Sequence, residues 1–322
     1  MRYVVIGAGA IGGTIGARLH EAGRDVLLIA RGPHLAAIRK QGLCLDEPGR
    51  SRTLRLPAVG HVSEVGWEHN DVVLQCTKTQ DSESVLDALL AVAPGVPVIC
   101  AQNGVANERF AASRFAEVQA VCVMLPAEHL MPGRVVAYST PTPGILDVGG
   151  FPHGVDRLTE QIVGDVSAAG FSSRADSAIM RWKYRKLLSN LGNAAEAVCG
   201  GDDRDFLALD AAARAEGERC LAAAGIAFAS IEEDRQRRGD LISLQPVGGR
   251  SRQGGSTWQS LQRRTGSIEA DFLNGEIVAL GQRYGVATPI NLLLQQTAAA
   301  MAQNGEQPGG RRAADLLVEA GR

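Results

Sequence analysis

Lysine is rare in this 322-residue chain, and one lysine lies in a pattern that could support catalysis. Four of the 33 basic residues are lysines, and the rest are arginines. Unlike arginine, lysine can release its proton when its surroundings shift its pKa. On a helix, Lys186, Asn190 and Asn193 would fall within about 60° of one another. One amine and two amides on an otherwise apolar helix could bind a polar substrate. A stripe that faces solvent is the alternative.

A second pattern, near the N-terminus, is typical of phosphate binding. An apolar strand at residues 3–6 precedes a GxGxxG motif, and a helix is expected at residues 14–22. The glycines of such a motif allow a tight turn, close approach of a pyrophosphate and close packing of helix on strand. The helix N-terminus offers free amides to the phosphates. A fortuitous glycine-rich turn is the alternative. The motif predicts dinucleotide binding by Gly7, Ala8, Gly9, Ala10, Ile11 and Gly12.

The end of the next predicted strand, residues 25–30, indicates which dinucleotide binds. NAD-binding proteins usually carry an acidic residue there, which holds the ribose hydroxyls. This chain has Ala30, Arg31 and Gly32 instead. A guanidinium pairs well with a phosphate and stacks on an aromatic ring. We therefore expect Arg31 to bind the 2′-phosphate of NADP, the alternative being an ordinary solvated arginine.

These residues need a scaffold, and the first half of the chain predicts one. Short apolar runs at residues 72–76, 96–101 and 120–125 alternate with helical stretches such as residues 82–92. The alternation predicts an α/β fold of Rossmann type, a doubly wound parallel sheet with helices on both faces. Residues 134–140 and 144–148 are expected to form a late antiparallel addition, followed by a helix at residues 155–169.

From about residue 178 the pattern changes to long helical stretches with few strands. We place the end of the first domain at Asp176. The chain then has an NADP-binding domain at residues 1–176 and an all-helical substrate and catalytic domain at residues 177–304. Residues 305–322 follow a Gly/Pro-rich break and are expected to form a loosely attached tail. The predicted helices cover residues 178–198, 207–224, 232–240, 256–264, 268–284 and 290–303.

Composition and charge exclude several classes of function. A net charge of −2 provides no basic surface for nucleic acid or anionic lipid. No apolar run approaches the ~20 residues of a membrane helix. The apolar start ends at Gly7, so we expect neither a signal peptide nor an anchor, and we assign the protein to the cytoplasm. The six cysteines and six histidines lack metal-ligand spacing, so we expect no metal site and buried, unreactive cysteines.

The kind of dehydrogenase can be narrowed by the catalytic groups that are missing. Short-chain reductases need a YxxxK motif, and none of the four tyrosines has a lysine four positions later. Lactate- and malate-type enzymes use a histidine, but no histidine follows His153, so the second domain cannot supply one. A lysine is the natural remaining candidate for the general acid.

The motifs together resemble the ketopantoate reductase family across nearly the whole chain. The resemblance implies NADPH-dependent reduction of a 2-oxo acid, most simply ketopantoate (2-dehydropantoate) to pantoate in pantothenate biosynthesis. It implies that Lys186 is the general acid. Nearby Lys183 and Arg185 are cationic neighbours that could lower its pKa. The matching segments are residues 7–12, 31, 77–78, 102–104, 186 with 190, 268–271, 274–275, 285–289 and 291.

The same resemblance implies roles for further side chains. Lys78 and Asn103 would line the nicotinamide end of the cofactor. Glu269, expected in the first turn of its helix, would sit where cofactor and substrate meet, as a catalytic and cofactor-binding residue. The residues expected to hold the substrate are Asn103, Lys186, Asn190, Asn193, Ser256 and Thr257.

The sequence departs from the family pattern in the substrate pocket. The family often has a second asparagine eight residues past the lysine, where this chain has Ala194, and neighbouring Asn193 is expected to replace it. Trp258 and Gln259 stand where smaller apolar residues are common. These differences leave open a divergent reductase for another 2-oxo acid or ketone. An NADP-binding sensor without turnover is a less favoured alternative. Monomer and homodimer both fit the sequence.

Overall fold

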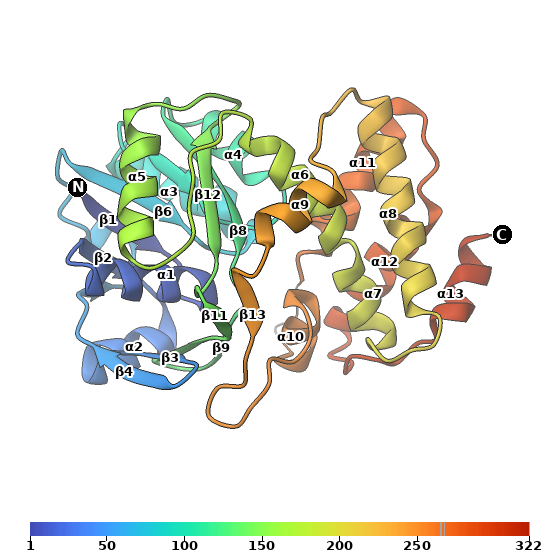
Figure 1. Cartoon of the computed structure of the whole chain (residues 1–322), viewed down its shortest axis with the longest axis horizontal. Coiled ribbons are helices and arrows are strands. Elements are labelled where there is room, and N and C mark those ends of the chain that lie inside the picture. The colour runs from blue at the N-terminus through green and yellow to red at the C-terminus, as the bar shows by residue number, and fades with distance from the viewer. Residues whose placement is uncertain (265, 267, 322) are drawn as a thin grey trace. The chain divides into compact units, whose positions relative to one another are not determined.

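The chain folds into two compact units. The computed structural model describes residues 1–264, 266 and 268–321 (Figure 1). The first unit comprises residues 1–183 and 231–252, and the second comprises residues 184–230 and 253–322. Each unit has its own secondary structure, a set of sheets in the first and helices in the second, so each is described by itself.

A seven-stranded sheet forms the centre of the first unit. Its neighbouring strands are parallel except for the pair β12 and β8 at one edge, which is antiparallel. The order changes direction between β1 and β6, and a doubly wound sheet binds its ligand beside such a switch point. The predicted Rossmann-type fold is therefore confirmed. Across the sheet the strands are β12 (Ile145–Gly150), β8 (Val118–Met124), β7 (Val98–Cys100), β6 (Asp71–Gln75), β1 (Arg2–Ile6), β2 (Asp25–Ile29) and β5 (Ala58–Val59).

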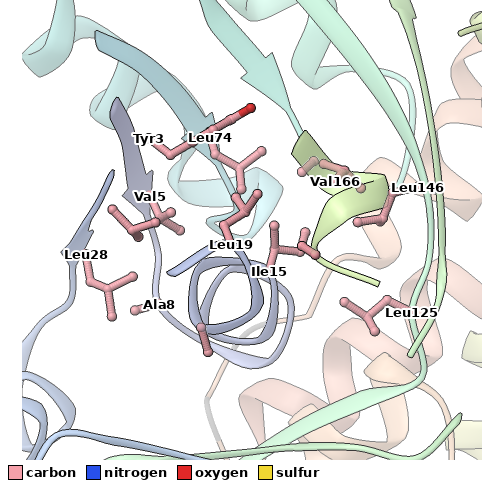
Figure 2. Close-up of a cluster of buried hydrophobic side chains, with 14 of the residues drawn as sticks. Tyr3, Val5, Ala8, Ile15, Leu19, Leu28, Leu74, Leu125, Leu146 and Val166 are labelled. Atoms are coloured by element: carbon pink, nitrogen blue, oxygen red, sulfur yellow. The ribbon is translucent and has the colours of Figure 1, made fainter. Parts of the chain in front are cut away.

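Alternate side chains of each strand bury against helices on opposite faces of this sheet. Tyr3 and Val5 of β1 pack in a cluster with α1 (Ala10–Glu21) and α5 (Arg157–Ala168), as Figure 2 shows for Ile15, Leu19 and Val166. Val4 and Ile6 point the other way, into a cluster with α3 (Ser82–Val92) and α4 (Asn107–Ala112). The period-2 alternation of a strand thus gives the sheet two apolar cores.

A second sheet, which the sequence did not predict, covers the side of α1 away from the main sheet. It contains β4 (Arg50–Leu54), β3 (Leu43–Glu47), β10 (Arg134–Ala137) and β9 (Ala127–Met131), in that order. Leu45 and Val135 belong to the same apolar cluster as α1. The prediction that residues 134–140 extend the main sheet is wrong, because β10 pairs with β3 and β9. Residues 139–141 form β11 (Ser139–Pro141), which pairs with β13 (Ile242–Leu244).

The second unit is helical, and one predicted helix is interrupted. Residues 178–198 form α6 (Ile179–Asn190) and α7 (Gly192–Cys199), with Leu191 between them. The Leu191 carbonyl accepts a hydrogen bond from Asn274 Nδ2 at 3.2 Å, and Gly192 lies against Asp210 without room for a Cβ. The other helices of this unit are α8 (Phe206–Ala223), α10 (Ser256–Gln262), α11 (Asn274–Tyr284), α12 (Pro289–Gln303) and α13 (Ala313–Ala320).

Two segments differ from their expected surroundings. Helix α9 (Ile231–Arg238) belongs to the first unit, where Arg237 donates two hydrogen bonds to buried Asp147 at 2.6 and 2.7 Å. Residues 305–322, expected as a loose tail, contain α13, whose Ala313 and Leu316 are buried.

Candidate functional site

The turn between β1 and α1 is built so closely that only glycine fits at two positions. Gly7 has a φ of +95°, and a Cβ there would lie 3.0 Å from the backbone of Cys76 and Thr77. A Cβ on Gly12 would lie 2.3 Å from the Gly7 carbonyl oxygen. Helix α1 begins at Ala10 with no acidic residue in its first turn. Its N-terminal amides and dipole therefore favour an anion at this turn.

The polar residues predicted to bind a cofactor all follow parallel strands of the main sheet. Gly7 follows β1, Arg31 closely follows β2, Lys78 follows β6 and Asn103 follows β7. These four strands are mutually parallel, so their carboxyl ends share one edge. The structure therefore brings the predicted cofactor residues of the first unit to a single edge, beside the switch point.

Arg31 is placed so that a ligand could bind it. It caps α2 (Gly32–Gln41), and its side chain is 73% exposed. Its ion-pair partner is Asp81 Oδ2 at 3.5 Å, and the Asp81 side chain is itself 45% exposed. Exposed pairs of this kind contribute about 0–1 kcal/mol. A phosphate could therefore replace the carboxylate at little cost.

A buried polar network fixes the loops that carry Lys78 and Asn103. Gln102 Nε2 donates to the Thr77 carbonyl at 2.8 Å and to Ser82 Oγ at 2.9 Å. Ser82 in turn donates to Asn107 Oδ1 at 2.6 Å, and Asn107 Nδ2 donates to the Asn103 carbonyl at 3.2 Å. These hydrogen bonds connect the loop after β6 with the loop after β7.

Lys183 also stabilises the loop that carries Asn103, through the carbonyl of Gln102. Its ammonium group lies 2.5 Å from Glu108 Oε1 and donates to the carbonyls of Gln102 and Val121 at 3.0 and 3.3 Å. The ion pair is defined by distance, since neither Glu108 oxygen has hydrogen-bond geometry. Both side chains are at most 1% exposed. The sequence did not single out this pair, since Lys183 was expected only as a cationic neighbour of Lys186.

In the second unit, α6 and α7 present the predicted polar residues. Lys186 and Asn190 lie one turn apart on α6, whereas Asn193 lies on α7, beyond the interruption at Leu191. The three residues therefore do not share one continuous helix, as had been expected. Asn190 Nδ2 is buried and makes no hydrogen bond with the described part of the chain. A buried amide donor without a partner is costly, so it is a candidate ligand-binding group.

The start of α10 lies against Asn193. A Cβ on Gly255 would lie 2.8 Å from Asn193 Oδ1, and the Gly255 N–H donates to Glu196 Oε2 at 2.7 Å. Ser256 Oγ is buried without a hydrogen-bond partner among the described residues, and neighbouring Thr257 is only 2% exposed. Asn193 and the predicted pair Ser256 and Thr257 are therefore brought together within this unit.

The structure also shows the surroundings of other residues that the sequence singled out in the second unit. Glu269 is not in the first turn of an α-helix: it precedes a 3₁₀ turn at Ala270–Phe272, and α11 begins at Asn274. Arg185, expected as a cationic neighbour that could lower the pKa of Lys186, lies 3.5 Å from Glu218. Asn274 and Asn291 are fully buried and hydrogen-bonded to each other at 3.0 Å, so they hold the helices together.

The described residues contain no candidate metal site, and burial raises the pKa of several of their cysteines. No group of three His, Cys, Asp or Glu side chains there could hold a metal ion. None of the six cysteines forms a disulfide, and four of them are buried. Burial raises the pKa of the Cys100 thiol well above its usual value and that of Cys199 to about 11, so both stay protonated. None of the described helices is long and apolar enough to cross a membrane.

Known proteins resemble both halves of the chain. The family model for ketopantoate reductase PanE/ApbA matches residues 3–152, and the model for the C-terminal part of these reductases matches residues 178–302. The 2-dehydropantoate 2-reductase of Pyrococcus horikoshii is 26% identical over 311 residues, and that of Archaeoglobus fulgidus is 28% identical over 300. Each alignment covers 91% of this chain and 95% of the relative.

Solved structures have the same fold. The PanE/ApbA family ketopantoate reductase from Ralstonia eutropha aligns with a TM-score of 0.78 and 28% identity, covering 95% of this chain and 99% of that one. A D-mandelate dehydrogenase solved with NADH and anilino(oxo)acetate has a TM-score of 0.79 at 24% identity and the same coverage, which shows a shared fold. Because the family models match most of its length, this chain belongs to the ketopantoate reductase family, whose members are oxidoreductases acting on CH–OH groups.

Proposed function

We propose that this protein is a 2-dehydropantoate 2-reductase that uses NADPH to reduce ketopantoate to pantoate. The observation that carries the proposal is the pair of family matches, which include the glycine turn and the helix with Lys186. Residues 1–176 would bind the cofactor, and residues 177–304 would supply the substrate site and the proton. Residues 305–322, expected as a tail, include the packed helix α13. A homodimer remains a prediction.

The residues of the first unit fit a dinucleotide. The space that a Cβ would fill at Gly7 and Gly12 is occupied by backbone, so the turn can stay tight enough for a pyrophosphate to approach. Arg31 supplies an exposed guanidinium where NAD-binding proteins usually have a carboxylate, which favours the 2′-phosphate of NADP. Lys78 and Asn103 would hold the nicotinamide end, with Glu269 at the junction with the substrate. When bound, NADPH supplies a hydride to C2 of the substrate.

The side chains of the second unit would bind and protonate the substrate. Reduction at C2 develops negative charge on the carbonyl oxygen, which Lys186 would stabilise and protonate. Asn190 supports this assignment because its buried Nδ2 still has a hydrogen bond to give. Asn193, Ser256 and Thr257 would complete the substrate site. The charges of Lys183 and Arg185 lie beside Glu108 and Glu218, so we do not assign them a part in activating Lys186.

A different 2-oxo acid or ketone is the second candidate substrate. Ala194, where the family often has asparagine, is 1% exposed and can offer no hydrogen bond from its side chain. Trp258 packs so closely on Gly254 that a Cβ there would lie 2.5 Å from the indole ring. Both features change the proposed substrate site beside Asn193 and α10. They favour a substrate of a different shape if the protein does not reduce ketopantoate.

The experiment is NADPH oxidation by the purified protein, followed by absorbance with ketopantoate and with a panel of other 2-oxo acids. Lys186→Ala should lower kcat about 10²–10⁴-fold while NADPH still binds. Lys40→Ala, which removes an exposed lysine from α2, is the matched control and should leave turnover unchanged. Normal turnover by Lys186→Ala would contradict the general-acid role. Tight NADPH binding without turnover of any 2-oxo acid would support a sensor.

Coenzyme preference is tested separately with Arg31→Ala. Hydrogen bonds to charged groups contribute about 1.5–3 kcal/mol, so binding of NADPH should weaken at least about tenfold while binding of NADH changes little. Arg39→Ala is the matched control, because Arg39 is also an exposed arginine of α2 paired with a carboxylate, Glu64, at 3.3 Å. Equal losses for NADPH and NADH would argue against recognition of the 2′-phosphate by Arg31.

A further inference from the structure

A buried histidine connects the glycine turn to two other segments of the first unit. His34 lies in the first turn of α2, three residues after Arg31, and is 9% exposed. Its Nε2 lies 2.7 Å from the carbonyl oxygen of Ala8, inside the GxGxxG motif. Its Nδ1 accepts a hydrogen bond of 2.8 Å from the N–H of Gly133, in the turn between β9 and β10. One ring therefore links three segments that are far apart in the sequence.

The two partners determine where the imidazole carries its proton. A backbone N–H can only donate, so Nδ1 of His34 must be the acceptor from Gly133. A carbonyl oxygen can only accept, so Nε2 must carry the hydrogen and donate to Ala8. The ring is thus the neutral Nε2–H tautomer, with both nitrogens in use. Burial lowers the pKa of His34 from its ordinary value, which favours the same neutral form.

The bond to Ala8 also fixes the direction of a neighbouring donor. The peptide between Ala8 and Gly9 is trans and planar, so its carbonyl and its N–H point in opposite directions. The Ala8 side chain is buried in the apolar cluster of Figure 2, so this residue is also held by packing. The Gly9 N–H makes no hydrogen bond with the described residues, although it stands at the start of α1.

We propose that His34 is a positioning residue for the cofactor, which keeps the Gly9 N–H turned out of the turn as a donor to the pyrophosphate. The proposal rests on the proposed function, because it needs a dinucleotide at the glycine turn. Since His34 and Arg31 share the start of α2, the same bond also fixes the distance between the pyrophosphate turn and the arginine expected at the 2′-phosphate. His34 acts through the backbone of Ala8 and has no part in hydride or proton transfer.

Two substitutions separate the two hydrogen bonds of the ring. His34→Gln places an amide N–H near the position of Nε2 and can still donate to Ala8. His34→Asn places a carbonyl oxygen near the position of Nδ1 and can still accept from Gly133, but its donor is too short to reach Ala8. His69→Asn, at an exposed histidine, is the control for the exchange itself.

The measurement is the Kd of NADPH, from fluorescence titration without substrate, together with kcat, the KM for NADPH and the melting temperature of each variant. We expect His34→Gln to bind within about twofold of the wild type, and His34→Asn to bind about tenfold more weakly, as the loss of one hydrogen bond predicts. The kcat at saturating NADPH should be the same in both.

Each other outcome is decisive. Equal weakening in both variants, or none in either, overturns the positioning role, and so does tenfold weaker binding by a His34→Gln protein with an unchanged melting temperature. If His34→Asn does not fold, this last comparison still tests the proposal. A wild-type protein that binds neither NADPH nor NADH would instead contradict the proposed function, whatever the variants do.

Discussion

The buried pair of Lys183 and Glu108 gives a quantitative test of how the start of α6 is held. The Lys183 and Glu108 side chains are 1% and 0% exposed. The ammonium group serves one carboxylate oxygen and two backbone carbonyls, those of Gln102 and Val121. In Lys183→Met the apolar stem is largely kept, so the change removes the charge and its donors and leaves little cavity. Glu108 is then an uncompensated carboxylate in the core.

The expected loss of stability in Lys183→Met follows from the isolated charge of Glu108. Removing one partner of a buried ion pair costs about 3–5 kcal/mol, because the desolvation of the other partner is no longer offset. For a domain of about 150–250 residues, 1 kcal/mol shifts Tm by roughly 2–4 °C. We therefore expect the Tm of Lys183→Met to fall by on the order of 10 °C.

Thermal unfolding of a double-mutant cycle measures the effect. The double variant Lys183→Met with Glu108→Gln should melt higher than Lys183→Met alone, because the second change removes the unpaired charge. Lys40→Met, at an exposed lysine, should stay within about 0.5 kcal/mol of the wild type. The reasoning is refuted if Lys183→Met costs less than about 1 kcal/mol, or if Glu108→Gln lowers the stability of the double variant further.

Three further predictions concern other positions. Gly12→Ala should abolish dinucleotide binding, since its Cβ would lie 2.3 Å from a backbone oxygen, whereas Gly66→Ala, with nothing within 4 Å, should bind normally in the same titration. Glu216→Ala should lower the free energy of unfolding by about 2–4 kcal/mol in a denaturant titration, because buried Glu216 accepts hydrogen bonds from the N–H groups of Ile290 and Asn291. The lowered pKa of His34 means that the unfolded chain takes up a proton below about pH 6.5 that the folded chain refuses. The stability of the wild type should therefore fall relative to that of His34→Gln as the pH drops from about 6.5 toward the lowered pKa, and the difference should stay constant above about pH 6.5. A parallel pH dependence of the two melting temperatures would contradict this. The neighbouring His129, whose ring lies 4.1 Å away, is the same in both proteins and so does not affect the comparison.

The main sheet could be predicted because its signals are local. Buried parallel strands are short apolar runs, and the helix at 82–92 has the bounds that its pattern predicts. The second sheet could not be predicted in this way. The burial pattern of β4, Arg50–Leu54, shows no fully buried residue, so it lacks the apolar signal of a strand. The pairing of β10 with β3 joins residues about 90 positions apart, which no local periodicity records.

In the candidate site, too, the features with local signals could be predicted and those that depend on distant residues could not. The glycine turn and Arg31 could be located from the sequence because each depends on its neighbours along the chain. At the interruption, the Leu191 carbonyl accepts a hydrogen bond from Asn274, 83 residues away, and the local pattern of 178–198 records no such contact. His34 likewise is hydrogen-bonded to Ala8 and to Gly133, which lie 26 and 99 residues away along the chain. The sequence motif locates the cofactor turn, but the groups that hold the turn in place come from distant segments.

In a chain with few lysines, Lys183 and Lys186 require lysine rather than arginine for different reasons. Lys186 is expected to be a lysine because lysine, unlike arginine, can give up a proton. At Lys183 the surroundings select a compact cation: one nitrogen lies 2.5 Å from a Glu108 oxygen in an ion pair and donates to two backbone carbonyls at 3.0 and 3.3 Å. A guanidinium has the same charge, but it is larger and its donors are held in a plane. Lys183→Arg should therefore fail to restore stability, with a Tm closer to that of Lys183→Met than to the wild type. An arginine variant with wild-type Tm would show that charge alone is required there.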